Sequence, residues 1–524
     1  MRRYLAFMLT LLLVLTAVGC GAQTDAPAQS GNAANANPKD TSENLTSSET
    51  AVGTDSISIS NDAPIPDYDP VNWYISSQSS LFQNVYSTLV DVIATDDLEI
   101  ELRPNLAKSW ETEEENTVWV FHLNEDAVYS NGDPVKAEHV KNCFERHMTN
   151  PYTMTYVSMI DSIEVRDEHT VAIRLKNAWA SVPYCWYMVA IFNPDLYDAD
   201  KESYIKNPVG SGPYELTALD EAQGTMRLTL KEDWWGTEKP TVKTIDVCTI
   251  TDPSTRVIAL QNGEIDFASL NSTNLRLVEG DNNLEMRENV SIVGYQLLLN
   301  PNVEPLNNEK VREAISYAID YNGIRNATCG GYVSSKDRTV VFSTLDTELP
   351  GSITPYTYDP AKAQALLAES GLELPIDVGE IVGGNSNGSA EMVQQYLADV
   401  GINATITQYE SNATVTKLMN GEFSLGIAAG VGCPTAAETM LNYYGTGQPY
   451  NFNKYSNPEV DALIDTLMTT SDAEEYQTCL EQALQIVVGD YTNMGLGIPA
   501  IYGVSSKGLY IPPVWNGVDM IRVR

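Results

Sequence analysis

Histidine is scarce in this sequence, and its placement excludes one common class of enzyme. The 524 residues contain only four histidines, which are His122, His139, His147 and His169. The segment 384–388 matches the Gly-x-Ser-x-Gly turn of α/β-hydrolases, but those enzymes need a catalytic histidine after the serine. All four histidines precede Ser386, so we expect no hydrolase. His139 and His147 lie about two helical turns apart and would need a third element to share a metal, so we expect both to be structural.

Closely spaced cysteines are also absent. Beyond Cys20 there are six cysteines at wide intervals, which are Cys143, Cys185, Cys248, Cys329, Cys433 and Cys479. No pair has the Cys-x-x-Cys spacing of zinc sites or thioredoxin-like centres. The wide intervals predict no disulfide, and we expect most of the six to be isolated buried thiols. Nothing in the sequence calls for a metal or another cofactor, and no catalytic residues are expected.

Positive charge is in short supply. Lysine and arginine total 31 against 70 acidic residues, which gives a formal net charge of -39. This balance argues against nucleic acid and against an anionic membrane surface as partners. It is typical of a protein kept soluble outside the cell, and a preference for cationic ligands is the less favoured alternative.

The one long apolar run lies at the N-terminus and is too short to cross a membrane comfortably. Arg2 and Arg3 precede an apolar stretch from Leu5 to Val18, whereas a spanning helix needs ~20 such residues. This layout predicts a secretory signal peptide over residues 1–20. Cys20 occupies the position at which bacterial lipoproteins are cleaved and lipidated, and an ordinary signal peptide with an incidental cysteine is the alternative. A diacylglycerol group on Cys20 would anchor the protein to the outer face of the bacterial cell membrane.

Residues 21–52 lack any apolar periodicity. They are rich in Ala, Asn, Ser, Thr and Gly, and such a segment cannot bury enough surface to offset its ordering entropy. We expect a flexible tether between the anchor and the folded part. The remaining chain, roughly 470 residues, is too long for one compact core and predicts two or three lobes.

The stretch from Pro104 to Arg146 is the most informative part of the chain. Residues 117–123 alternate β-branched and aromatic residues with smaller or polar ones, which predicts a half-buried strand. In the turn that follows, Gly132 can supply a positive φ, Asp133 can cap a helix and Pro134 suits the first helical turn. The predicted helix then runs to about Arg146, and its apolar stripe consists of Val140, Cys143, Phe144 and His147.

This stretch closely resembles the signature of the extracellular solute-binding proteins of family 5, which serve peptide and nickel ABC importers. The matching segments read Pro-x-Leu-Ala-x-Ser-Trp (104–110), Phe-x-Leu-x-x-x-Val (121–128) and aromatic-x-Asn-Gly-x-Pro (129–134). Val-Gly-Ser-Gly-Pro-Tyr (209–214) and the Trp-Trp-Gly of 234–236 also resemble the family, as do Asp252–Arg256 with Gly263–Asp266. The resemblance runs from about residue 52 to the end.

The resemblance implies a two-lobed α/β clamp with an extra subdomain in the first lobe. Lobe I is expected to comprise residues 53–88, 207–287 and 497–524, its subdomain residues 89–206, and lobe II residues 288–496. The β-α alternation of the second half fits an α/β lobe. Its predicted elements include strands at 293–300, 376–382 and 402–408 and helices at 311–320, 360–370, 390–400, 458–468 and 473–488.

The segment that would fix ligand specificity departs from the family pattern. Peptide-binding relatives carry Trp-x-x-Asp before a helix, and their aspartate pairs with the ligand's α-ammonium; here Cys433 falls at that position. No acidic residue occurs from Gly426 to Ala437. The arginines that hold a metal chelate in nickel-type relatives align with Thr153 and Ala190. The residues we expect to line the ligand cleft are Tyr74, Tyr156, Asn385, Gly432 and Cys433.

The function implied is that of a substrate-binding lipoprotein. Its lobes would close over a small solute, most plausibly a short peptide, and deliver it to ABC permease subunits and their ATPase. A nickel-chelate or other small-solute binder on the same scaffold is the second hypothesis. A surface receptor or chaperone without a transport role is the third, and a permease and ATPase encoded beside the gene would argue against it.

Overall fold

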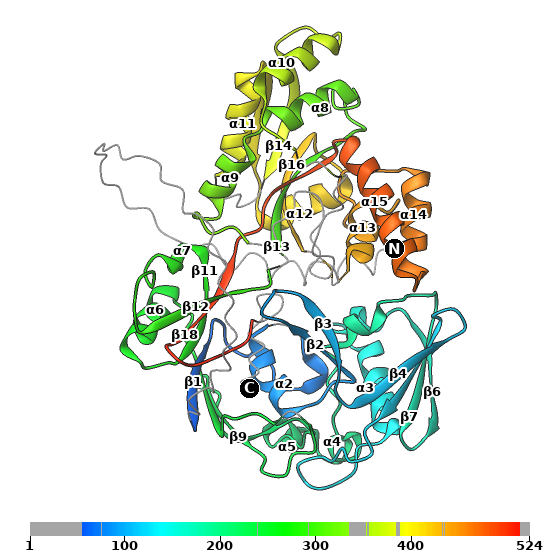
Figure 1. Cartoon of the computed structure of the whole chain (residues 1–524), viewed down its shortest axis with the longest axis vertical. Helices are drawn as coiled ribbons and strands as arrows, with labels where there is room; N and C mark the ends of the chain where they lie inside the picture. The colour runs from blue at the N-terminus through cyan, green and yellow to red at the C-terminus, as the bar shows by residue number, and fades with distance from the viewer. Residues whose placement is uncertain are drawn as a thin grey trace.

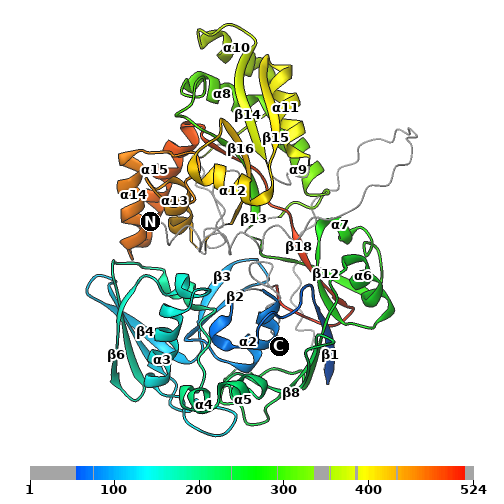
Figure 2. The same ribbon diagram turned by 180° about the vertical axis from the view of Figure 1, so that it is seen from behind.

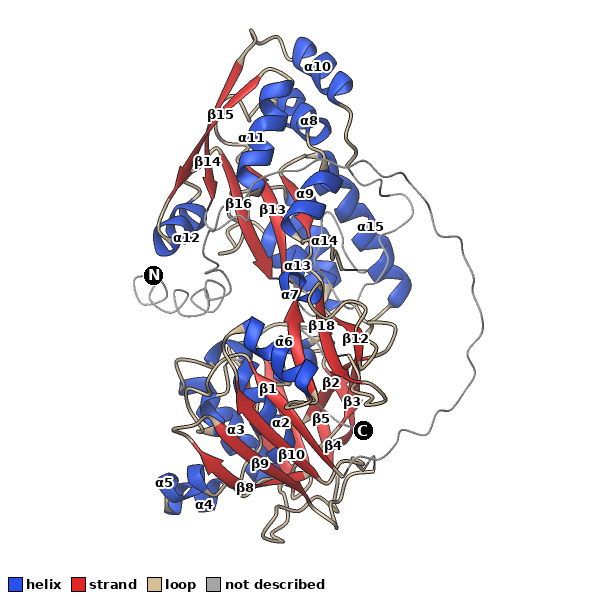
Figure 3. Ribbon diagram, turned by 90° about the vertical axis from the view of Figure 1, so that its left-hand side faces the viewer, coloured by secondary structure: helices blue, strands red, loops and turns tan. Residues whose placement is uncertain are grey.

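Two lobes stacked one above the other make up the protein (Figure 1). The computed structural model describes residues 55–74, 76–237, 239–291, 293–334, 353, 356–383, 388–431, 433 and 435–513. The described strands form sheets of seven, five, four and two strands. In the side view of Figure 3 the seven-stranded sheet lies in the lower lobe, lobe I, and the five-stranded sheet in the upper lobe, lobe II.

The sheet of lobe I gathers strands from both ends of the chain. Its order is β12 (Leu284–Asn289), β18 (Ile501–Ser506), β11 (Phe267–Asn271), β1 (Ser56–Asn61), β10 (Thr244–Thr249), β9 (Thr225–Leu230) and β8 (Tyr214–Asp220). β1 runs parallel to both of its neighbours, and the other pairs are antiparallel. In β1 the alternation of serine with isoleucine buries Ile57 and Ile59 on the core side of the sheet.

Short helices accompany this sheet. They are α2 (Ser79–Val85), α4 (Pro194–Ala199), α5 (Lys201–Lys206), α6 (Pro253–Asn262) and α7 (Ser272–Leu275). The predicted helix after Asp252 is confirmed: the Asp252 carboxylate accepts from Thr255 N, and Gly263 ends the helix in the left-handed region. Strand 56–60 and strand 244–249 are also confirmed.

A subdomain of antiparallel strands extends lobe I. It contains the hairpin of β2 (Val90–Ala94) and β3 (Ile100–Pro104) and a sheet of order β4 (Ala107–Glu113), β5 (Val118–Leu123), β7 (Thr170–Leu175) and β6 (Ile160–Asp167). Helix α3 (Ala137–Thr149) packs on β6 and β7. The predicted stripe of this helix is confirmed, because Val140, Cys143, Phe144 and His147 are all buried.

The predicted start of α3 was wrong. Asp133 and Pro134 belong to the preceding turn, in which Asp133 O accepts from Tyr129 N and Pro134 bridges back to Val128. The helix begins three residues later, after Lys136, and His139 completes its cap. Gly132 does adopt a positive φ, of 87°, as predicted. The turn needs Asp133 and Pro134 to return the chain to the sheet, so neither is free to start the helix.

Lobe II is built on a five-stranded sheet covered by helices on both faces. The strand order is β15 (Ile402–Gln408), β14 (Ile376–Gly383), β16 (Leu425–Val431), β13 (Val293–Leu299) and β17 (Asn493–Gly497). Helices α8 (Glu309–Ala318), α9 (Tyr321–Thr328), α10 (Pro360–Glu369) and α11 (Ser389–Asp399) contribute to the core on one face. Leu418 of α12 (Ser411–Asn420) packs over Leu298 on the other.

A separate helical layer completes lobe II. Helices α13 (Ala436–Tyr444), α14 (Pro458–Thr469) and α15 (Ala473–Gly489) share one apolar core. Nearly all strands and helices predicted for the second half are found within two residues of their expected bounds. The chain crosses between the lobes twice, from β12 to β13 and from β17 to β18.

The glycines of the segment Val209–Pro213 are explained by a close approach of two backbones. A Cβ added to Gly210 would lie 1.9 Å from the Val85 carbonyl oxygen, and one added to Gly212 would lie 2.5 Å from that of Asn84. Gly212 N donates to Val85 O at 2.9 Å. The end of α2 is thereby held against the sheet through main-chain atoms alone.

We expect Gly210→Ala to destabilise lobe I, because its methyl group meets a backbone carbonyl that cannot move aside. Overpacking of this kind costs about 2 kcal/mol, which corresponds to a fall of roughly 4–8 °C in the first thermal unfolding midpoint. Gly489→Ala is the matched control, since nothing lies within 4 Å of its added Cβ at the end of α15. Equal midpoints for the two variants, measured by calorimetry, would contradict the explanation.

Candidate functional site

The lobes meet where α13 and α14 approach the subdomain of lobe I. Figures 1 and 2 show the lower end of α14 above this subdomain, away from β13 and β18. Ala180 N donates to Met468 O at 3.0 Å, and Asn116 Nδ2 donates to Thr469 O at 3.1 Å. Both contacts use the last turn of α14, whose final carbonyls have no partner within the helix.

One acidic side chain makes the most extensive contact across this interface. Glu438 Oε1 accepts hydrogen bonds from Trp179 Nε1 at 3.0 Å and from Ser181 Oγ at 3.2 Å. The Cys185 thiol lies 3.9 Å from the same oxygen. Trp179, Ser181 and Cys185 all belong to the lobe I subdomain, so three neutral donors of one lobe converge on one carboxylate of the other.

Local structure places Glu438 at this point. Helix α13 begins after Thr435, whose hydroxyl accepts from Glu438 N at 3.1 Å and caps the helix. The helix follows directly on β16, so the end of that strand and the first turn of α13 lie together at the lower face of lobe II. The side chain of the third helical residue therefore points out of lobe II and into lobe I.

Burial without a counter-ion governs the chemistry of this carboxylate. Glu438 is only 4% exposed. Removal from water raises its pKa to about 7, although the hydrogen bonds from Ser181 and Trp179 act in the opposite direction. In the described part of the chain no lysine, arginine or histidine forms an ion pair with it. A buried charge of this kind is costly unless it is compensated.

The two thiols beside Glu438 are protonated groups. Burial raises the pKa of Cys433 to about 12 and that of Cys185 well above its usual value, and the nearby carboxylate adds to both shifts. Cys433 Sγ accepts from Asn442 Nδ2 at 3.0 Å, and Cys433 N donates to Thr439 Oγ1 at 3.2 Å. Neither thiol has the thiolate character of a nucleophile. They are neutral polar surface at the lobe interface.

The described contacts bring only part of the predicted site together. Cys433 lies at the lobe interface beside Glu438. Tyr74 lies in lobe I and stacks on Tyr152, with ring centroids 4.8 Å apart. Tyr156 lies in the short helix Met154–Tyr156, where burial raises its pKa to about 12. Asn385, Gly432 and Cys20 lie outside the described residues.

Sequence reasoning missed Glu438. The acid-free stretch that ends at Ala437 stops one residue before it, and the comparison with peptide-binding relatives directed attention to Cys433 instead. The signal was present as Thr435-x-x-Glu438, the spacing of a helix capping box. That pattern predicts the start of the helix, but it does not predict that the carboxylate reaches across to another lobe.

A buried amide beside the end of β16 was also missed. Gln296 on β13 is 1% exposed, and in the described structure neither its Oε1 nor its Nε2 has a hydrogen-bond partner. Its side chain lies so close to Gly430 that a Cβ there would be 1.9 Å from Nε2. A buried amide with both ends unsatisfied is expensive, so this side chain is suited to pairing with a polar group that enters beside β16.

The histidine and cysteine predictions are confirmed with one correction. His139 bonds Tyr129 Oη at 3.1 Å, and His147 bonds Thr153 Oγ1 at 2.8 Å, so each has a structural partner. All six cysteines after residue 54 are free. Only Cys143 and Cys329 are fully buried, whereas the other four are partly exposed, so the expectation of buried thiols is wrong for most of the six.

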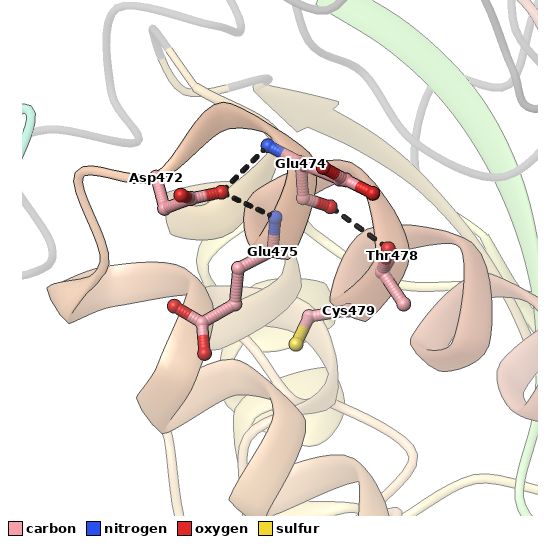
Figure 4. A pocket seen from close by; sticks show the side chains of 5 residues that line it. All are labelled: Asp472, Glu474, Glu475, Thr478 and Cys479. Atoms are coloured by element: carbon pink, nitrogen blue, oxygen red, sulfur yellow. Dashed lines mark hydrogen bonds between the residues drawn. The ribbon is translucent and has the colours of Figure 1, made fainter.

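Other parts of the described chain offer weaker evidence of a binding site. A hollow of about 560 Å³ opens at the start of α15, lined by Asp472, Glu474, Glu475, Thr478 and Cys479 (Figure 4). The Asp472 carboxylate is already used there, since it accepts from the main-chain N–H groups of Glu474 and Glu475, each at 2.9 Å. Among the described residues, no group of three histidine, cysteine, aspartate or glutamate side chains is placed to hold a metal ion. No described helix is long and apolar enough to cross a membrane.

Comparison with known proteins agrees with this architecture. Residues 101–452 match the family model described as bacterial extracellular solute-binding proteins, family 5 middle. The glutathione-binding protein GsiB of Pectobacterium atrosepticum is 25% identical over 473 residues, which covers 83% of this chain and 88% of that protein.

Solved structures show the same fold. That of HbpA2 from Haemophilus parasuis has a TM-score of 0.80 at 20% identity and covers 90% of this chain and 100% of its own. The ABC transporter-associated periplasmic binding protein DppA from Helicobacter pylori, in complex with the peptide STSA, has a TM-score of 0.67 at 22% identity and covers 89% and 96%. GsiB and DppA are both binding proteins. The chain belongs to the bacterial extracellular solute-binding proteins of family 5, the solute-binding components of ABC importers.

Proposed function

We propose that the protein captures short peptides between its lobes and delivers them to a membrane permease driven by its ATPase. The observation that carries the proposal is the pair of lobes that meet through the β16–α13 junction, the region in which peptide-binding relatives hold their ligand. The two crossings between the lobes provide a hinge. Greater affinity of the ligand for the closed arrangement would then drive closure.

Recognition in this proposal relies on neutral groups. Cys433 stands where peptide-binding relatives carry an aspartate for the ligand's α-ammonium, and a thiol with a pKa of about 12 supplies no charge at neutral pH. Affinity would therefore come from main-chain hydrogen bonds, which tolerate many peptide sequences. Tyr74, Tyr156, Asn385, Gly432 and Cys433 are the proposed lining residues, and Gln296 adds an amide able both to donate and to accept.

A nickel chelate or another small solute on the same scaffold is the second candidate. A receptor or chaperone role without transport is the third. The acid-free stretch before Glu438 favours neither a metal ion nor a strongly cationic ligand.

The closing motion is proposed to move three rigid units. They are lobe I (53–88, 207–287 and 497–524), its subdomain (89–206) and lobe II (288–496).

We expect peptides to co-purify with the protein. The folded protein is purified from its producing cells without a ligand-exchange step and is then denatured. The small molecules that denaturation frees are identified by mass spectrometry. The expected result is a mixture of short peptides, because main-chain recognition does not select one sequence. A metal chelate or a sugar, with no peptide, would contradict the proposal, and adding a peptide pool to the emptied protein distinguishes loss during purification from lack of binding.

We also propose that Cys20 carries a lipid anchor and that residues 21–52 tether the folded part outside the cell membrane. The support is the sequence of residues 1–20 and the extracytoplasmic character of the family. Two attachment features together hold a protein more firmly than one, and a diacylglycerol supplies two acyl chains.

Cys20→Ala is expected to release the protein from the membrane, because the acceptor of the lipid is removed. The measurement is fractionation of the producing bacteria, combined with incorporation of labelled fatty acid. Cys479→Ala is the control, since it removes a partly exposed cysteine far from the anchor. Fatty-acid incorporation that persists in Cys20→Ala would show that the anchor lies elsewhere.

A further inference from the structure

The contact around Glu438 joins the two lobes beside one of the segments that connect them. Val290 of the β12–β13 connection belongs to the apolar cluster against which Tyr184 and Tyr187 pack, on either side of Cys185. The chain crosses at the junctions β12–β13 and β17–β18, in the middle of the molecule in Figures 1 and 2. Trp179, Ser181 and Cys185 meet α13 from the subdomain, and Ala180, between the first two, bonds Met468 at the end of α14. Because its two sides belong to different lobes, this contact breaks when the subdomain and α13 move apart.

The burial of Glu438 is therefore a property of the closed arrangement. The three groups that approach Oε1 come from the lobe I subdomain, whereas the carboxylate's own lobe contributes the Thr435 main-chain N–H. With the lobes apart, the carboxylate loses its three lobe I partners and returns to water. Closing the lobes moves it from water into an interface without a counter-ion.

The groups that face Glu438 from each neighbouring element supply no positive charge. Cys185 approaches from the lobe I segment Val182–Trp186, and Cys433 approaches from the loop before α13. From α15, the phenol of Tyr476 accepts from Ala437 N at 3.2 Å. The Thr435 main-chain N–H also bonds this carboxylate, and a proton carried by Oε2 leaves the Trp179 and Ser181 bonds to Oε1 in place.

We propose that Glu438 is a proton-coupled latch: the lobes close with uptake of one proton by its carboxylate, so that acidification favours the closed protein even without ligand. The latch rests on the hinge motion of the proposed function but not on the identity of the ligand. A protonated Glu438 still accepts from Trp179 and Ser181 through Oε1, and closing no longer buries a charge. A charged Glu438 keeps these bonds but carries the desolvation cost.

The direction of the pH dependence follows from the two states. In water the carboxyl group has its ordinary pKa of 4.5, and burial in the closed interface raises the pKa to about 7. Closing therefore takes up a proton between these values, and the ratio of closed to open protein rises as the pH falls through this window. Between pH 8 and pH 5.5 the shift corresponds to at least about a tenfold rise in that ratio.

Small-angle X-ray scattering on the ligand-free whole protein tests the latch, because closure lowers the radius of gyration. We expect the wild-type radius to fall between pH 8 and pH 5.5 and that of Glu438→Gln to remain near its compact value throughout. The Gln variant keeps the acceptor oxygen and carries no charge. The Gln variant also retains all other charges of the protein, whose net charge is -39 in the wild type. Any change of its radius with pH therefore measures the effect of the other titrating groups on repulsion between the lobes. Asp465→Asn removes an exposed carboxylate of α14 and should behave as wild type.

Trp179→Phe supplies a second, independent readout on the other side of the interface. The ring is retained but the N–H that stabilises the charged carboxylate is lost, so the midpoint of the closure profile should move to higher pH. A radius that does not change with pH in wild type, or one that changes equally in wild type and Glu438→Gln, overturns the proposal. If Glu438→Gln does not fold, a Trp179→Phe midpoint equal to that of wild type overturns it. Peptide capture is judged separately by the co-purified ligands.

Discussion

The way the two lobes are joined depends on β18, which pairs with both β11 and β12 in the lobe I sheet. The strand near the end of the described chain inserts between two strands of the lobe I sheet, bonding β11 on one side and β12 on the other. Lobe II is thus a long insertion whose two ends both return to the same sheet. The lobes are joined by two adjacent strand connections, a geometry that permits bending but resists separation and twisting.

With the connections fixed at one place, the contacts of α13 and α14 with the subdomain control how firmly the lobes hold together. The main-chain contacts at Met468 and Thr469 are neutral and change little with conditions. Glu438 is different, because it is the carboxylate that the other lobe covers without a cation to meet it. Neutral contacts give the interface its register, and in the proposed latch the charge of Glu438 makes the free energy of closure depend on pH.

The sequence was a good guide to local structure and a poor guide to contacts between lobes. Capped helices such as the one after Asp252 and alternating strands such as β1 are set by short-range chemistry, which a single chain displays directly. Even there the start of α3 was misplaced, because Asp133 and Pro134 can serve equally in a turn or a helix start, and only the neighbouring strand decides between them. The family motifs added the architecture that periodicity alone does not contain.

Glu438 and Gln296 escaped notice for a common reason. Each is a polar residue in an ordinary local setting, a helix cap and a sheet strand, and each becomes unusual only through what packs over it. Trp179 lies more than 250 positions before Glu438, and Gly430 lies more than 130 after Gln296. No local pattern encodes such separations, so the chemistry of this interface becomes visible only in three dimensions.

Two features of this segment are related. Position 433 lacks the ammonium-binding aspartate, and Glu438 follows five residues later. A carboxylate at position 433 would add a second buried negative charge beside Glu438, and two like charges in one dry interface repel strongly. A neutral thiol at Cys433 avoids that repulsion and donates or accepts only weakly. Glu438 is the carboxylate that the described contacts place across this interface, and its position on α13, against Trp179 and Ser181, joins the lobes. In the proposed function, recognition of the ligand is left to main-chain groups, aromatic surface and the amide of Gln296, a combination suited to neutral, extended and variable ligands.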